Sequence, residues 1–347
     1  MVARERSSRV ASAAAARPVA GAGVRLGEAS NGAIREQLSD IQCARIVNAT
    51  FDVSCERGAG NVSVAHIVQR AGVSRRTFYE LFRDRDECFL AAFEQALEYA
   101  CERVLPAYES QKDWREKIRA SLLAFLSFLD EEPAIGRVLI VESVAAGSGT
   151  LARRSEIAGL LTGVVDQGRT ADKATGTVPP LTGEGIVGGV LSVIHTRLSA
   201  SEHEPLVELA KPLMSMIVLP YLGAAAARKE LERPMPEPSV KPRRTQLLAD
   251  PFKDTGLRLT YRTVRVLAAI SDHPGASNRL IGDTAEIKDQ GQISKLLMRL
   301  QRAGMITNTG LPLDKGAPNR WALTDTGQQV VTTIRAHTEG LHRAGEP

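Results

Sequence analysis

Arg75, Arg76, Thr77 and Tyr79 lie close together in the run SRRTFYELF, and their types suit the recognition of nucleic acid. Arginine can donate two hydrogen bonds to the edge of a guanine, and threonine can contact the methyl group of a thymine. Tyrosine and serine hydroxyls can bond phosphate oxygens. These residues therefore indicate contact with DNA, provided that one short element presents them together.

The element that must present them is a short helix that begins after Ser74, a residue well suited to cap a helix N-terminus. Phe78, Leu81 and Phe82 fall on one side of this helix and predict a buried face. The polar residues fall on the other side at its N-terminal end, which is the end that enters the major groove in helix-turn-helix recognition. A pair of arginines is often only a solvated face, but the cap and the three apolar residues favour DNA contact.

A second short helix is expected just before this one. Ser63 is a suitable cap, and Val64, Ile67 and Val68 give the helix one apolar face. Gly72 can take the backbone angles that a tight turn between two helices demands. The sequence thus predicts a helix-turn-helix motif.

The run RIVNATFDVSCERGAGNVSVAHIVQRAGVSRRTFYELFRDRDE closely resembles the DNA-binding domain of TetR-type transcriptional regulators, with the likeness covering about residues 36–93. The resemblance implies a DNA-facing set made of Ser63, Ser74, Arg75, Arg76, Thr77, Tyr79 and Arg85, the last of them near a phosphate. It also implies that the following helices form a ligand pocket and a two-helix dimer interface.

Helical periodicity continues through residues 113–227, with breaks at Pro and Gly positions and no alternating strand pattern. We expect this all-α block to bind an unidentified small-molecule effector and to form a homodimer. The candidate pocket residues are Trp114, Phe125 and Phe128, each of which is more often a plain core residue.

A second basic helix is expected in the run KDQGQISKLLMRLQRAGMI, from Lys288 to Ile306. Its leucines and Ile293 fall at i, i+3, i+4 and i+7 and form one apolar stripe. Two helices are expected before it, and two short strands, Met305–Asn308 and Arg320–Thr324, after it. This succession resembles the winged helix of MarR-type regulators.

That resemblance implies a second DNA-contacting set, with four residues on the recognition helix and two on the wing: Gln292, Ser294, Lys295, Arg299, Lys315 and Arg320. Winged helices also serve as protein-interaction modules, and Asp283, Glu286 and Asp289 stand just before the basic face. Both alternatives remain open at this point, because a fold does not fix a function.

These observations predict a mostly α protein with a TetR-like helix-turn-helix, an α-helical regulatory bundle and a small α+β winged helix. The expected parts are a disordered tail at 1–33, a DNA-binding domain at 34–94, a ligand-binding and dimerisation domain at 95–227, a Pro- and charge-rich linker at 228–254 and a winged-helix domain at 255–347.

Other kinds of chemistry find little support in the sequence. The four cysteines form no C-x-x-C pair, so we expect free, partly buried thiols and no metal site. The match to G-x-G-x-x-G at Gly183–Gly188 lacks a preceding strand, and packing of small residues explains it better than a dinucleotide. We therefore predict no enzyme, no cofactor and no metal. With no apolar run of the length of a membrane span, we also predict a cytoplasmic protein without a membrane partner.

The most economical interpretation is a ligand-responsive repressor that binds a pseudo-palindromic operator in double-stranded DNA as a homodimer. The winged helix would then give a second DNA contact. The alternatives are a regulator whose winged helix binds protein, and a ligand carrier or enzyme that does not bind DNA. The net charge of +4 is compatible with all of them.

Overall fold

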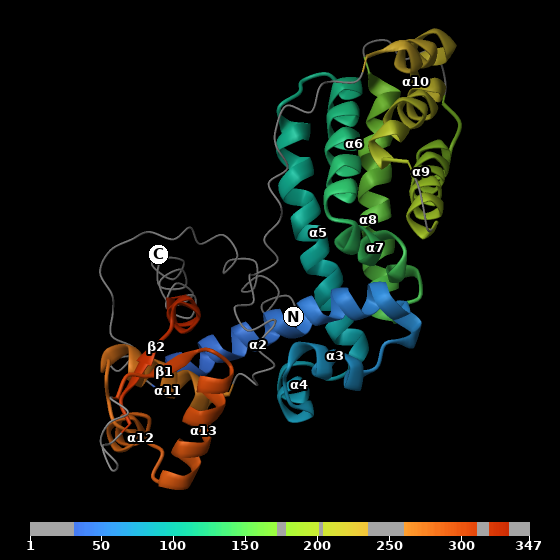
Figure 1. The fold of residues 1–347 in the computed structure, drawn as a ribbon. Coiled ribbons are helices and arrows are strands. Elements are labelled where there is room, and N and C mark those ends of the chain that lie inside the picture. Colours follow the sequence, from blue (N-terminus) through green and yellow to red (C-terminus); the bar gives the residue numbers. More distant parts are fainter. Residues whose placement is uncertain (1–30, 172–177, 201–203, 235–259, 311–318, 333–347) are drawn as a thin grey trace. The chain divides into compact units, whose positions relative to one another are not determined.

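The computed structural model describes residues 31–171, 178–200, 204–234, 260–310 and 319–332 (Figure 1). Of the predicted features, the tail up to residue 30, most of the linker and Lys315 in the wing lie outside the described residues. The described residues fall into two compact units. One unit holds residues 31–49, Val64–Arg83 and 260–332, and the other holds Thr50–Ser63 and 84–234. The long helix α2 (Asn31–Arg57) contributes to both.

In the first unit, α3 (Val64–Ala71) and α4 (Arg75–Leu81) form the predicted helix-turn-helix. The turn between them contains Gly72 with φ at 64°, a left-handed conformation that glycine adopts without strain. The Val73 N–H donates to the Val68 carbonyl oxygen at 3.1 Å and closes the turn. The Ser74 side chain accepts from the Thr77 N–H at 3.0 Å, so the predicted cap of α4 is confirmed.

The described residues of the C-terminal part of the same unit include the helices α11 (Tyr261–Asp272), α12 (Asn278–Thr284) and α13 (Gln290–Arg302) and the strands β1 (Ile306–Asn308) and β2 (Trp321–Leu323). Residues 325–332, after β2, are helical as well. The strands pair antiparallel, with Thr307 opposite Ala322. The predicted order of elements is therefore confirmed, and the caps of α12 and α13 are Ser277 and Asp289.

The core of this C-terminal part is made of the residues that the helical periodicity selected. Ile293, Leu297 and Leu300 are fully buried, while Leu296 packs against the core from its margin. Trp321 of β2 is buried as well, and its indole N–H donates to the Asn278 side-chain oxygen at 2.6 Å. A buried indole N–H needs such a partner, so this bond ties β2 to α12.

The second unit is a helical bundle built from α5 (Arg85–Glu109), α6 (Trp114–Glu131), α7 (Pro133–Ile140), α8 (Ser148–Asp166), α9 (Thr182–Ser199) and α10 (Ala210–Glu232). Four short 3-10 helices lie between these elements or before them: η1 (Ala59–Asn61), η2 (Glu142–Val144), η3 (Gln167–Thr170) and η4 (Leu206–Leu209). In Figure 1, α5, α6 and α8 run side by side. The expectation of a mostly α chain is confirmed.

Helix α10 is longer than expected and corrects the start of the linker. The composition predicts an extended linker from residue 228, but residues 228–232 are helical. The reason is that Glu230 is completely buried and forms ion pairs with Arg115 and Arg119 of α6. Arg233, just after the helix, pairs with Glu116 at 2.7 Å. These charges belong to the bundle.

The span Leu206–Glu232 is also long and apolar enough, by length and composition, to cross a membrane, so the expectation that no such stretch exists was wrong. Met214, Val218 and Tyr221 of this helix are fully buried in the bundle. A core helix of a helical bundle passes the same test of length and composition. The helix also breaks at Gly223, whose φ and ψ of 80° and 174° are not helical.

Candidate nucleic-acid interface

The surface of α4 places the predicted DNA-reading residues on one exposed side. Arg75 and Arg76 are exposed, Thr77 is half-buried, and Tyr79 is 58% exposed although its ring is large and partly apolar. On the opposite side Phe78 is completely buried and meets the Tyr79 ring edge-on, with the ring centroids 5.5 Å apart. Burial of Phe78 therefore fixes which side of α4 faces outward.

Two of the residues on α4 already have partners within the helix. The Arg76 Nε donates to Glu80 at 2.8 Å, an exposed i,i+4 pair that a phosphate or a base can displace at little cost. The Thr77 hydroxyl lies 2.9 Å from the Ser74 hydroxyl. Because Ser74 caps the helix, its first role is structural, and its contact with DNA stays a prediction.

The remaining two residues of the N-terminal set lie before and after the two short helices. Ser63 is half-buried and immediately precedes α3. The Arg85 guanidinium donates to the carbonyl oxygens of Val62, at 3.1 Å, and Gly60, at 3.4 Å, and pairs with Asp86. Arg85 therefore holds the segment that leads into α3, a role that the sequence did not indicate.

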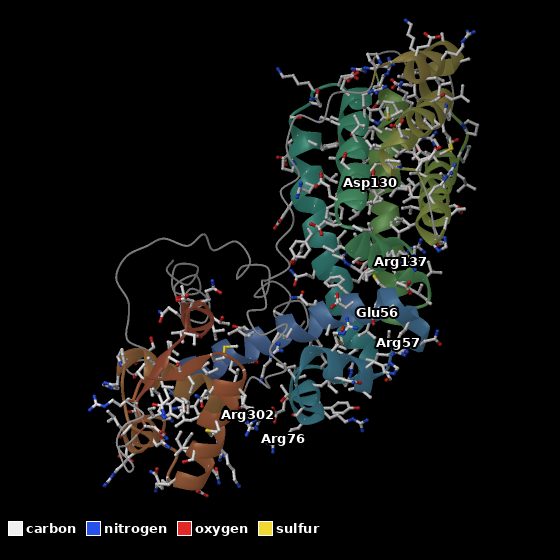
Figure 2. All side chains as sticks on the ribbon, in the orientation of Figure 1. Glu56, Arg57, Arg76, Asp130, Arg137 and Arg302 are labelled. Carbon is white, nitrogen blue, oxygen red and sulfur yellow. The ribbon has the colours of Figure 1, made fainter. Side chains whose placement is uncertain are left out.

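The second predicted set, on and near α13, contains exposed cations and two polar residues that form hydrogen bonds with neighbouring helices. Lys295 and Arg299 are exposed, and Arg302 continues the same stripe one turn further (Figure 2). Gln292 accepts from Arg262 at 2.8 Å, and Ser294 accepts from the Asn278 amide at 3.2 Å. Arg320 is exposed next to β2.

The acidic residues before α13 are engaged in bonds of their own. The N–H groups of Gln292 and Gly291 donate to Asp289 and hold the pKa of its carboxyl below its usual range, as expected for a helix cap. Arg265 donates to Glu286 at 2.6 Å and lowers the pKa of that carboxyl too. Both groups stay ionised at neutral pH, and both have partners.

The expected pocket residues are placed in the bundle, where Trp114 is a packing residue. Its indole N–H donates to the Val164 carbonyl at 3.1 Å, and its ring lies 5.3 Å from the Tyr221 ring. Phe128 is fully buried, and Phe125 is half-buried. Their role in binding an effector remains a prediction.

The cysteines and the glycine run, to which the sequence assigns no chemistry, pack differently, and the predicted packing of small residues is not seen within the described residues at Gly185 and Gly188. All four cysteines are free thiols, as predicted, and burial raises the pKa of Cys55 to about 11. The glycine run forms the first turns of α9, where a Cβ at Gly189 would meet Met216 at 3.7 Å while Gly185 and Gly188 face open space. Among the described residues, no group of three His, Cys, Asp or Glu side chains could hold a metal ion.

Comparison with known proteins agrees with the helix-turn-helix. Residues 46–92 match the family described as bacterial regulatory proteins, tetR family. A stretch of 93 residues is 27% identical to the HTH-type transcriptional activator FasR of Mycolicibacterium smegmatis, covering 27% of this chain and 42% of the length of FasR.

Two solved structures are similar at lower identity. The fatty acid degradation regulator FadR from Bacillus halodurans is 18% identical, with a TM-score of 0.46, over 51% of this chain and 94% of that protein. FadR from Bacillus subtilis, solved with stearoyl-CoA, is 20% identical, with a TM-score of 0.45, over 50% of this chain and 96% of that protein. The family match covers α3 and α4, so this part of the chain is similar to the helix-turn-helix domain of tetR-family regulators.

Proposed function

We propose that the protein represses transcription by binding a pseudo-palindromic operator as a homodimer, with α4 of each copy in a major groove. The observation that carries this proposal is the division of α4 into a buried side, fixed by Phe78, and an exposed side that presents Arg75, Arg76 and Tyr79. An arginine at the N-terminal end of a recognition helix can read guanine, and an exposed tyrosine can bond a phosphate. Two-fold symmetry of the dimer would be mirrored in the operator.

The direct test is selection of genomic DNA fragments by the full-length protein, followed by binding measurements on the selected fragment. Arg75→Ala should weaken binding about tenfold or more, as loss of a base-reading arginine does. Arg228→Ala removes the same charge from an exposed position on α10 and serves as the matched control. Unchanged binding by Arg75→Ala would exclude α4 as the reader.

The proposed effector is a small molecule bound in the helical bundle, with Trp114, Phe125 and Phe128 as candidate contacts. A ligand can change operator affinity only by binding the two conformations of the regulator unequally. A reporter gene placed behind the selected operator, with and without deletion of the regulator gene, distinguishes repression from activation. The second outcome has a precedent, since the relative FasR is named an activator.

We further propose that the chain has five parts. A tail at 1–33 is followed by a DNA-binding domain at 34–94 and an effector-binding and dimerisation domain at 95–227. A linker, predicted from residue 228, then leads to a winged-helix domain at 255–347. Because residues 228–232 are helical and Arg233 pairs with Glu116, we propose that the linker begins after Arg233 and not at residue 228. We place the protein in the cytoplasm, where a regulator of this kind meets chromosomal DNA.

The winged helix is proposed to give a second DNA contact through Lys295, Arg299 and Arg320, with Lys315 on the wing. Support comes from the stripe of exposed cations on α13. Lys295→Ala/Arg299→Ala in the full-length protein should shorten the footprint and reduce the dependence of binding on salt concentration.

A protein-interaction role is the second candidate for this domain. It is favoured by the 46% exposed Met298, which stands among the cations of α13, and by the bonds that engage Gln292 and Ser294 within the domain. An unchanged footprint and an unchanged salt dependence in the double variant would favour this role.

A further inference from the structure

The short segment between α2 and α3 leads directly into the helix-turn-helix. It comprises Gly58 and η1, and it turns sharply because Gly58 has φ at 75°. The Gly58 N–H donates to the Ser54 carbonyl at 2.8 Å, and the Asn61 N–H donates to the Gly58 carbonyl at 3.0 Å. The position of this segment decides where the chain enters α3.

A carboxylate from a distant part of the chain holds this segment. Glu142 of η2 is only 5% exposed, and its Oε2 accepts from the Ala59 N–H at 2.6 Å. Ala59 is buried too, at 4% exposure, so its N–H depends on this acceptor. A buried N–H that loses its acceptor bears the full cost of desolvation, which makes Glu142 important for the position of η1.

Glu142 is itself oriented by an arginine that reaches a third element. Nη2 of Arg137 on α7 donates to Glu142 Oε1 at 3.1 Å, and Nη1 donates to the Leu198 carbonyl at 2.8 Å. Leu198 lies in the last turn of α9, where carbonyl oxygens lack partners within the helix. The planar guanidinium thus joins the end of α9 to the carboxylate that holds η1.

A second support and a cavity adjoin the same segment. Arg85 donates to the carbonyls of Gly60 and Val62 from the start of α5. A small cavity beside it is lined by Thr50, Ala59, Val62, Arg85, Asp86, Phe89 and Ala146. The cavity therefore adjoins the segment at Ala59 and Val62.

We propose that the bonds from Leu198 through Arg137 and Glu142 to Ala59 transmit the position of the C-terminal end of α9 to the segment that sets α3. The four residues are positioning residues, since none of them lies on the predicted DNA-reading face. Movement of α9 by effector binding would withdraw the Leu198 carbonyl, free Arg137 and weaken the hold on η1. This inference rests on the proposed function, because it supplies the route by which the bundle controls DNA affinity.

The first test needs neither DNA nor effector. Amide hydrogen exchange is measured on the full-length protein, comparing the Ala59 N–H with the N–H of Phe51, which is buried in α2. Arg137→Met should speed exchange at Ala59 about tenfold relative to Phe51, since Glu142 loses its orienting partner. Arg153→Met is the matched control, because Arg153 also forms ion pairs, one with the part-buried Glu94 and one with the exposed Glu156, and neither of these bonds reaches this segment.

Conservative variants separate transmission from simple stabilisation. Glu142→Gln retains an oxygen that accepts from Ala59 and should show a smaller increase in exchange than Glu142→Ala. Arg137→Lys keeps the charge but cannot bridge Glu142 and Leu198 with one planar group, so it should resemble Arg137→Met. Two results would overturn the proposal. One is an Ala59 exchange rate in Arg137→Lys equal to that of the natural protein, and the other is an equal increase of this rate in Arg153→Met and Arg137→Met.

The second test uses the genomic fragment selected above as the probe. Arg137→Met and Glu142→Ala should each lower affinity for it about tenfold, and the double variant should lose no more than the larger single loss, because both act in one chain of bonds. Independent, additive losses would contradict the proposal. If no fragment is bound at all, the proposed function fails, while the exchange experiment still decides whether these bonds hold η1.

Discussion

The helices α4 and α13 were both predicted to read DNA, yet they use their polar residues differently. On α4, Arg75 and Tyr79 are exposed, and the pair Arg76–Glu80 lies entirely on the surface. On α13, the half-buried Ser294 accepts from Asn278, and the exposed Gln292 accepts from Arg262 of the same unit. Resemblance to a recognition helix therefore identifies a face, but bonds within the domain decide how much of that face can bind a partner.

The largest effect is expected from removing the packing that orients α4. Phe78→Ala should destabilise the protein by about 3–5 kcal/mol, the usual cost of deleting a fully buried phenylalanine. DNA binding should be lost with it, because the reading side is no longer fixed. Thermal unfolding with binding at a temperature below the transition measures both, and Tyr79→Phe, which retains the ring, should leave stability unchanged.

A similar loss of a buried ring in the C-terminal part of the chain should affect α13 without affecting the binding of α4 to DNA. Trp321→Ala removes a buried ring and its bond to Asn278 and should cost about 3–5 kcal/mol within that domain. Contact of α4 with the operator, seen as protection of its half-sites in a footprint, should persist. Loss of all protection would show that the two regions do not act separately.

A smaller effect is expected from each arginine that reads a base. Arg75→Ala should lower operator affinity about tenfold or more and relax the preference at one base position. Arg76→Ala should have a similar effect and also leave Glu80 without its partner. Arg76→Ala/Glu80→Ala restores the balance of charge. Recovery of affinity in that double variant would mean that Arg76 contributes charge and not base recognition.

The effect of cations on α13 should be smaller still and should depend on salt. Lys295→Ala is expected to reduce the slope of log affinity against log salt concentration by about one, since one phosphate contact is lost. Sequence preference should not change. Lys288→Ala, an exposed lysine just before the helix, is a charge-matched comparison. If this salt slope is the same for the natural protein, Lys295→Ala and Lys288→Ala, the protein-interaction role is favoured.

The smallest effect is expected from the cap of α4. Ser74→Ala removes the acceptor for the Thr77 N–H and should cost about 0.5–2 kcal/mol of stability. Ser74→Asp keeps an acceptor and should preserve stability, but its charge would repel a nearby phosphate. Reduced DNA binding by Ser74→Asp at full stability would indicate that Ser74 also lies close to DNA.

The sequence by itself determined the elements whose information is local. The cap at Ser74, the turn at Gly72 and the burial of Phe78 lie within a few residues of one another, and the same holds for the stripe from Ile293 to Leu300 on α13. Periodicity and caps act over one or two helical turns, so these elements could be predicted together with their buried sides.

Only the tertiary structure decided which charged residues are structural. Glu142 bonds Ala59 from 83 positions away, Arg137 bonds Leu198 from 61, and Arg115 pairs with Glu230 from 115. In the sequence a carboxylate that will be buried against an arginine looks the same as one on a solvated face. Its partner is brought to it by the packing of whole helices, because a charge can be buried only where the fold supplies hydrogen bonds and an opposite charge.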